Sequence, residues 1–339
     1  MDKRRMMRGS AFVLALTVAL SAFVLPKVYA AVGVKTDEKC TIQIDLRNNG
    51  YRELIGEEAL PVEIELYKVA DIDVSGKFTP LSAYDALDFS VIDSDTTAEG
   101  WNELAVGAKT EIEADEITAD AAGSTEYGQM TIDNLETGLY LVDVQQVVSD
   151  NYVYDFSPFL VSLPNNYYYS TQDDTWIYDL TGENALQPKI ERTDRYGDLI
   201  INKLLDTYNE TIGGATFVFQ IEASKTDIDA VEGAADKTKV VYSDVVSMTF
   251  DGTGTDSITI KDLPAGAEVT VTEIYSGASY KVTTDAAKTV KILAEDAVNV
   301  DFENTYDGRL NGGSGVVNSF TYDGETATWI PSQAEDSTP

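Results

Sequence analysis

Residues 198–206, DLIINKLLD, form a largely apolar, β-branched segment of the kind that builds a β-strand. Seven more short segments of this kind follow it, each bounded by turn residues: 215–222, 239–250, 257–260, 268–273, 279–283, 288–293 and 297–304. Short strands with turn signals between them, and almost no helical periodicity, predict a β-sandwich over residues 198–306.

A second β-rich domain is predicted upstream, over residues 31–182. Its expected strands are 40–46, 61–70, 129–134, 139–147, 158–164 and 175–180. Between them, Trp101, Leu104, Ala105 and Ala108 recur at helical spacing, which predicts one short amphipathic helix within 97–116. The polar, Pro-containing stretch 183–197 is expected to be a linker, and 307–339 a polar tail. The sequence therefore predicts an all-β protein with two sandwich domains in series.

The composition of the chain excludes several kinds of function. The 339 residues include no His and one Cys, so catalysis by a His base, a zinc site of the His type and an internal disulfide are all excluded. A net charge of -34 repels phosphate backbones, so nucleic acid is not expected as a partner. No metal or cofactor site is predicted, because the acidic turns at 71–73 and 251–256 lack the ligand set of a calcium loop.

Residues 1–30 have the pattern of a secretory signal peptide. Four basic residues precede an apolar run over 11–25, and the segment ends in Val28-Tyr29-Ala30, which suits cleavage after Ala30. The alternative is an uncleaved membrane anchor, for which the apolar run is short. A secreted protein without disulfides needs another source of stability.

Three polar residues fall on apolar faces of the predicted strands. Residues two apart in a strand share a face, and by this rule Lys203, Glu273 and Asn304 each lie among Leu, Ile, Val or Phe. Burial favours a neutral amine and a protonated acid. A neutral lysine can then attack the asparagine carboxamide while the acid polarises the carbonyl and relays the proton, leaving an isopeptide bond and ammonia. The alternative is a partly buried ion pair with a capping asparagine near the strand ends.

Residues 198–306 resemble a CnaB-like domain of Gram-positive surface proteins and pilins. The resemblance is carried by GDLIINK in the first strand, FVFQI, LPAGAEVTVTE and the closing VDFENTY. It implies an immunoglobulin-like fold and a Lys–Asn isopeptide bond, with Lys203 as amine donor, Asn304 as amide and Glu273 as catalytic acid.

The first domain resembles the N-terminal domain of Gram-positive pilins. The matching segments are PVEIELYKVADI, DNLETGLYLVDV, PFLVSLP, and Trp176 with the pair Pro188-Lys189. The resemblance implies that Lys189 is a candidate acceptor for the next subunit, joined by a sortase, although the spacing departs from the family pattern. An ordinary solvated linker lysine is the alternative.

A first-domain isopeptide bond is a further possibility that the sequence leaves open. Lys68 lies on an apolar face, with Asp143 as a candidate acid and Asn184 as a candidate amide, although Val144 stands where the acid would be expected. A strand-end lysine whose ammonium reaches solvent is the alternative.

The leading interpretation is a secreted, non-enzymatic protein of a Gram-positive cell surface or cell wall. It would be a pilin subunit or adhesin stalk, with other pilus subunits and a sortase as partners. The alternative is an adhesin module whose first domain binds a host protein or glycan; a secreted glycosidase, which needs only two carboxylates, is the third hypothesis. The end of the chain has no LPxTG-like sorting signal, since Ile330-Pro331-Ser332-Gln333-Ala334 is only loosely similar. The mode of anchoring and the position in a pilus are therefore left open.

Overall fold

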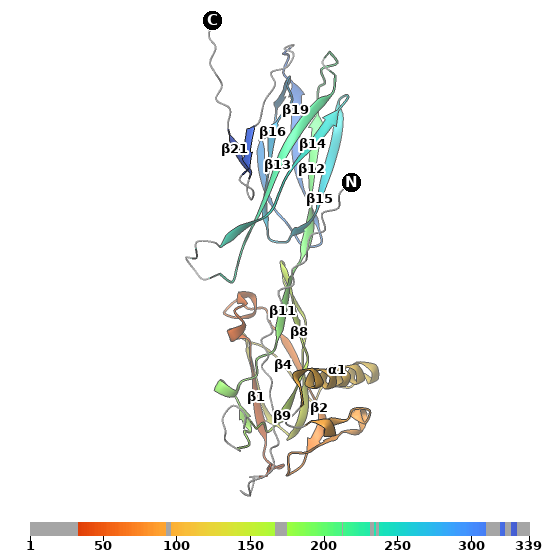
Figure 1. Ribbon diagram of the computed structural model, residues 1–339, viewed down its shortest axis with the longest axis vertical. Coiled ribbons are helices and arrows are strands. Elements are labelled where there is room, and N and C mark those ends of the chain that lie inside the picture. The colour runs from red at the N-terminus through yellow and green to blue at the C-terminus, as the bar shows by residue number, and fades with distance from the viewer. Residues whose placement is uncertain are drawn as a thin grey trace. The chain divides into compact units, whose positions relative to one another are not determined.

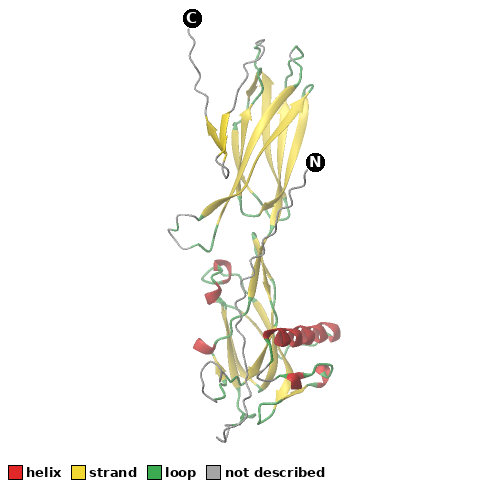
Figure 2. Ribbon diagram, in the orientation of Figure 1, coloured by secondary structure: helices red, strands yellow, loops and turns green. Residues whose placement is uncertain are grey.

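The computed structural model describes residues 33–92, 96–166, 175–211, 213–230, 234, 237–309, 319–322 and 327–330. The predicted signal peptide and most of the predicted tail lie outside these residues. The chain divides into two compact units (Figures 1 and 2). Unit 1 runs to Asp194 and takes in Ile228–Ala234, and unit 2 consists of Arg195–Asp227 and the chain from Ala235 onward. The boundary falls inside the stretch 183–197 that was expected to be a linker.

Unit 1 is built from β-strands and one α-helix. The elements are β1 (Cys40–Asp45), β2 (Glu63–Ile72), β3 (Phe78–Pro80), α1 (Ala98–Asp115), β4 (Ala121–Ser124), β5 (Gln129–Leu135), β6 (Gly138–Val144), β7 (Val147–Val148), β8 (Tyr152–Phe156), β9 (Phe159–Leu163), β10 (Asp179–Leu180) and β11 (Ile190–Asp194). Single-turn 3-10 helices lie at Arg47–Asn49, Arg52–Leu54, Ser82–Tyr84, Phe89–Val91 and Gly182–Asn184.

The central sheet of unit 1 is covered on both faces, which explains why every residue of β6 is buried. The sheet order is β3-β2-β6-β9, with β4 also paired to β2. Tyr140 and Val142 point into a core shared with the sheet β10-β1-β5, whereas Leu139 and Leu141 point into a second core under α1. Strand alternation thus distributes one apolar run between two cores.

The helix α1 has a capped start and a small-residue face. The Thr97 hydroxyl accepts a hydrogen bond from the Gly100 N–H at 3.1 Å, which satisfies one of the free donors of the first turn. Ala105, Ala108 and Ile112 are its buried residues. The predicted helix is therefore present, and at 18 residues it is longer than expected.

The stretch expected to be a linker contains a strand. β11 pairs antiparallel with β8 over Ile190–Asp194, in a sheet ordered β11-β8-β7. Its side chains are half-buried or exposed, so the strand depends on backbone pairing and carries little apolar signal in the sequence. The segment 175–180, expected to be a strand throughout, has strand structure only at Asp179–Leu180.

Unit 2 is a β-sandwich in which all eight predicted strands are present. They are β12 (Tyr196–Leu205), β13 (Ala215–Thr226), β14 (Thr238–Phe250), β15 (Gly254–Pro264), β16 (Glu268–Tyr275), β17 (Tyr280–Val282), β18 (Ala287–Lys291) and β19 (Ala297–Tyr306). β20 (Ser319–Tyr322) and β21 (Ala327–Ile330) form a separate hairpin.

The two sheets of the sandwich have the orders β15-β12-β19-β17 and β14-β13-β16-β18. β12 and β19, the first and last strands of the sandwich, lie side by side and run parallel. The core between the sheets includes Phe217 and Phe219 from one sheet and Ile201 and Phe302 from the other. The prediction of an all-β protein with one helix in its first domain is therefore confirmed.

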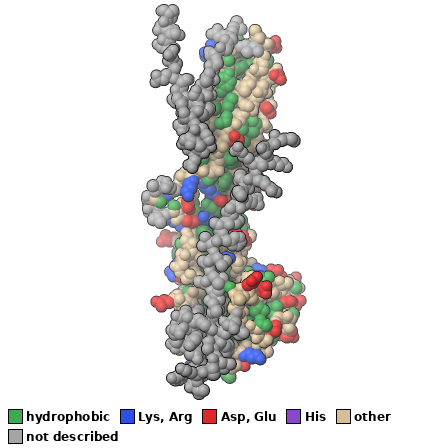
Figure 3. Space-filling model, viewed as in Figure 1, with side chains coloured by type: hydrophobic (Ala, Val, Ile, Leu, Met, Phe, Trp, Pro, Cys, Tyr) green, Lys and Arg blue, Asp and Glu red, His purple; other side chains and the backbone are tan. Residues whose placement is uncertain are grey.

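Acidic side chains of the described residues are spread over the surface. The chain has 58 Asp and Glu residues, and acidic side chains appear at several places over both units (Figure 3). Within the described residues no helix is long and apolar enough to cross a membrane.

Candidate functional site

Strand pairing brings Lys203 and Asn304 to one place in the core of unit 2. Lys203 lies opposite Phe302 and Leu205 lies opposite Asn304 in the parallel ladder of β12 and β19. Both polar side chains point between the sheets, as the alternation predicts, and both are 0% exposed. A lysine and an asparagine 101 residues apart in sequence thus occupy neighbouring positions in the core.

Glu273 reaches the same place from the opposite sheet. It lies near the end of β16, on the buried face that also carries Val269 and Val271, and is 7% exposed. Its neighbour on β13 is Phe219, at a position where the ladder register shifts. The three side chains predicted from the sequence therefore meet between the two sheets.

The three side chains form a closed set of hydrogen bonds. The Lys203 Nζ lies 2.8 Å from Oε2 of Glu273 and donates a short hydrogen bond to Oδ1 of Asn304. The Asn304 Nδ2 donates to Oε1 of Glu273 at 2.5 Å and to the Ser276 carbonyl at 3.4 Å. One carboxylate oxygen thus contacts the lysine nitrogen and the other contacts the amide nitrogen.

Aromatic side chains keep water from the lysine. The Nζ of Lys203 lies 4.5 Å from the ring centroid of Phe217 and 5.7 Å from that of Phe219. The Phe302 ring packs on Phe219 at a centroid distance of 5.1 Å. Burial lowers the pKa of Lys203 from its ordinary value near 10.5, and the hydrogen bond to Glu273 opposes this shift. The surroundings therefore favour the neutral, nucleophilic amine.

This arrangement is set up for amide exchange at the side chain of Asn304. The hydrogen bond from Nζ to Oδ1 holds the amine next to the carboxamide carbon, and a carboxyl group contacts both nitrogens that exchange protons. The sequence analysis expected the acid to polarise the carbonyl. In the structure Glu273 instead contacts the amide nitrogen, which is the leaving group.

The candidate for an isopeptide bond in unit 1 is not assembled. Lys68 lies on the face of β2 that also carries Leu66 and is paired with Asp71 at 2.6 Å. Asp143 lies on the opposite face of the same sheet, under α1, and is paired with Lys109 at 2.7 Å. Asn184 lies in a 3-10 turn whose first residue, Gly182, bonds Gln43 of β1. The geometry therefore does not support a bond at Lys68.

Lys189, the candidate acceptor for the next subunit, is exposed and directly precedes β11. Its carbonyl accepts a hydrogen bond from the Ser157 N–H at 3.4 Å, so its backbone is fixed beside β8 and β9. The preceding Pro188 is buried, and Trp176 is half-buried against the core under α1.

Two ionic arrangements in unit 1 were not anticipated from the sequence. Lys109 of α1 pairs with the buried Asp143, although the helical pattern gave no sign of which strand the helix would cover. Arg192 of β11 stacks between the rings of Tyr51 and Tyr152, at 4.9 and 4.3 Å from their centroids. Alternating tyrosines at 152 and 154 were the one available signal for this second arrangement. No group of three metal-ligating side chains occurs among the described residues.

Comparison with known proteins gives matches at low identity. A family model described as a domain of unknown function (DUF5979) matches residues 199–307. No curated protein matches the chain. Among solved structures, the chain is similar to a streptococcal ancillary pilin at 16% identity and a TM-score of 0.26, with 86% of this chain and 80% of that chain covered.

Two further pilin structures are similar over most of the chain. The minor pilin of Streptococcus agalactiae is 16% identical, with 82% of this chain and 100% of that chain covered and a TM-score of 0.21. The shaft pilin of Lactobacillus rhamnosus GG is 15% identical, with 80% and 100% covered and a TM-score of 0.27. These three structures are pilins of Gram-positive bacteria, and at such scores the likeness carries no argument about function.

Proposed function

We propose that this chain is a secreted structural protein of a Gram-positive cell surface, a pilin subunit or adhesin stalk. Its second unit would be closed by an autocatalytic isopeptide bond between Lys203 and Asn304. The observation that carries the proposal is the buried ring of contacts among these two residues and Glu273. A secreted chain with one cysteine, itself buried and free, has no disulfide to stabilise it, and this bond would do so instead.

The proposed reaction needs no cofactor. A proton passes from the Lys203 Nζ to Oε2 of Glu273, and the neutral amine attacks the Asn304 side-chain carbon. Glu273 then delivers a proton through Oε1 to Nδ2. The Nζ–Cγ bond forms, the Cγ–Nδ2 bond breaks and ammonia leaves. The second proton lost by the lysine stays on Glu273 or leaves with ammonia as ammonium, so atoms and charge balance.

The competing interpretation is a permanent buried ion pair. A buried ion pair is weak evidence for stability, because removing two charges from water costs about as much as their attraction returns. An ion pair needs no third partner, yet here the asparagine amide contacts both ions. That third contact favours the reactive interpretation.

Intact mass tests the proposal. The purified chain should be lighter by one ammonia than its sequence mass, and peptide mapping should recover Lys203 and Asn304 in one branched peptide. A folded chain of unmodified mass would reduce the cluster to an ion pair with an amide partner and remove the main support for a structural role.

The polymer-forming part of the proposal rests on Lys189. Its amine is exposed beside a backbone fixed against Ser157, which suits an acceptor for a sortase-bound subunit. Lys189→Arg should abolish high-molecular-weight ladders on the cell surface. The matched control is Lys261→Arg, which changes an exposed lysine on β15 of unit 2 and should leave the ladders intact. Ladders that persist in the Lys189→Arg strain would exclude this acceptor.

A further inference from the structure

The proposed reaction must release ammonia from a place that is closed to solvent. Lys203 and Asn304 are 0% exposed, and protein interiors are packed to the density of organic crystals. The leaving nitrogen is Nδ2 of Asn304, and besides the catalytic carboxyl it contacts the Ser276 carbonyl. The way out of the core should therefore begin at the segment that contains Ser276.

The sheet is open beside this segment. β13 and β16 pair from Val218 and Tyr275 onward, so the first residues of β13 have no partner from β16. After Tyr275 the chain leaves this sheet, turns through Gly277 with a φ of +82°, and enters β17 of the other sheet at Tyr280. Between the start of β13 and this crossing loop the sandwich has a gap in its backbone ladder.

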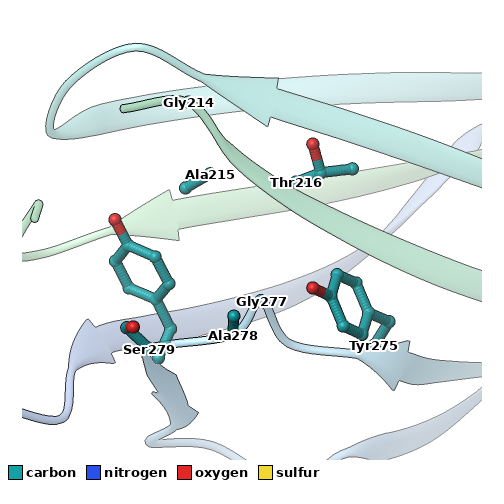
Figure 4. A pocket seen from close by; sticks show the side chains of 8 residues that line it. Gly214, Ala215, Thr216, Tyr275, Gly277, Ala278 and Ser279 are labelled. Carbon is teal, nitrogen blue, oxygen red and sulfur yellow. The ribbon is translucent and has the colours of Figure 1, made fainter. Parts of the chain in front are cut away.

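A cavity of about 200 Å³ occupies this gap. It is lined on one side by Gly214, Ala215 and Thr216 and on the other by Tyr275 and the loop through Ser279 (Figure 4). Gly214 at its rim is exposed, whereas Ala215 and Ser279 at its floor are buried. The cavity thus runs from the surface toward the core, and is named the window below.

The floor of the window has a polar group with unused bonding capacity. The Ser279 side chain lines the window, is 2% exposed, and its Oγ has no hydrogen-bond partner. A buried hydroxyl without a partner costs free energy that a small hydrogen-bonding molecule would recover. The Ser276 carbonyl, three residues earlier, already accepts a hydrogen bond from the leaving nitrogen.

We propose that the window is the exit site for ammonia, holding it by a hydrogen bond to Ser279 Oγ on its way from Asn304 to solvent. The proposal rests on the isopeptide reaction proposed above. Ammonia and water share the required chemistry, since each is small and both donates and accepts hydrogen bonds. Water can enter by the same route as ammonia leaves, and dilution of the released ammonia into solvent makes the release effectively irreversible.

The test is a time course of bond formation in the full chain. The chain is made by cell-free translation, which is then stopped, and samples are quenched in acid and denaturant. Intact mass gives the fraction that has lost ammonia, and limited proteolysis of parallel samples gives the fraction folded. Thr216→Phe adds a large side chain to a residue that lines the window. Thr270→Phe is its matched control, because each threonine bonds a threonine across the same sheet and only Thr216 lines the window.

The expected result is slower loss of ammonia from folded Thr216→Phe than from folded Thr270→Phe. Ser279→Ala, which keeps the fold's packing, should slow the reaction by roughly twofold to tenfold, the rate equivalent of one hydrogen bond. If Thr216→Phe fails to fold, Ser279→Ala decides alone. If Ser279→Ala loses ammonia at the wild-type rate, or if the two phenylalanine variants lose it at equal rates, the proposal that the window is the exit site would be overturned. A wild-type chain that never loses ammonia would instead overturn the isopeptide reaction.

Discussion

Removing the proton relay should uncouple the fold of unit 2 from its cross-link. Glu273→Gln keeps the size of the side chain and its bonding to Asn304, but it cannot take a proton from Lys203, so the bond should not form. The linked residues are 101 apart in sequence. Chain-entropy arithmetic for a closed loop of this size gives about 4.7 kcal/mol of lost stability at 25 °C.

That free energy corresponds to a large shift in melting temperature. With an unfolding entropy of about 2.1 cal/mol/K per residue and roughly 110 residues in the sandwich, the expected fall is roughly 20 °C. The melting temperature of Glu273→Gln should fall by more than this, because the substitution also leaves Lys203 buried without its carboxylate partner. The double variant Lys203→Met with Glu273→Gln has neither bond nor buried charge, so it isolates the contribution of the cross-link.

Calorimetry and intact mass, run on the same samples, make the test decisive. Glu268→Gln is the matched control, since it lies on the same strand with its side chain exposed, and it should keep both the mass loss and the melting temperature. If Glu273→Gln still loses ammonia, the acid has been wrongly assigned. If the double variant lacks the bond yet has the melting temperature of the wild type, the entropic argument for the cross-link is refuted.

Three further results are expected in unit 1. Arg192→Met removes a cation that stacks between two tyrosine rings and pairs with Asp229, and should lower the free energy of unfolding by about 2 kcal/mol, measured by urea titration. Burial raises the pKa of Cys40 to about 12, so the native protein should not react with a thiol reagent at pH 8, and rapid labelling before unfolding would contradict this. The hydrogen bond from Arg47 lowers the pKa of Asp45 below its ordinary 3.8. This carboxylate therefore stabilises the fold above its unfolded pKa, and the contribution is lost as the pH falls through the folded pKa. Asp45→Asn should show a smaller loss of melting temperature than the wild type below about pH 4. If the melting temperatures of the two proteins fall equally with decreasing pH, this contribution of Asp45 would be ruled out.

The strands of unit 2 were predictable because their sequence signal coincides with their burial. Every second residue from Leu199 to Leu205 faces the core, and the one polar member of that series, Lys203, stands out for this reason. The strand β11 gave no such signal. Its side chains are half-buried or exposed, and its pairing with β8 uses backbone groups that any sequence supplies.

Alternation identified the three residues of the candidate site one strand at a time, but alternation alone does not bring them together. Alternation shows that Glu273 points inward; it does not show that β16 lies in the sheet opposite β12 and β19. The resemblance to isopeptide-forming domains supplied that step. Lys68 met the same alternation rule, but the isopeptide bond considered for it is not supported. Its candidate acid Asp143 lies on the other face of a sheet that is covered on both sides. Parity within a strand identifies a buried face, whereas the choice between two buried faces is made by tertiary packing.

The position of the proposed bond matters as much as its existence. In the proposed fibre, tension along the chain would enter the sandwich through β12 and leave through β19, which are adjacent parallel strands. Hydrogen bonds between parallel strands pulled at opposite ends are loaded together in shear, and each contributes only about 1 kcal/mol. A covalent bond from Lys203 to Asn304 joins these two strands directly, so the load passes from one to the other without crossing the strands between them. The residues between 203 and 304 then carry no tension. A cross-link between two interior strands would leave both terminal strands free to be pulled away, and the first and last strands are therefore where a load-bearing fibre needs it.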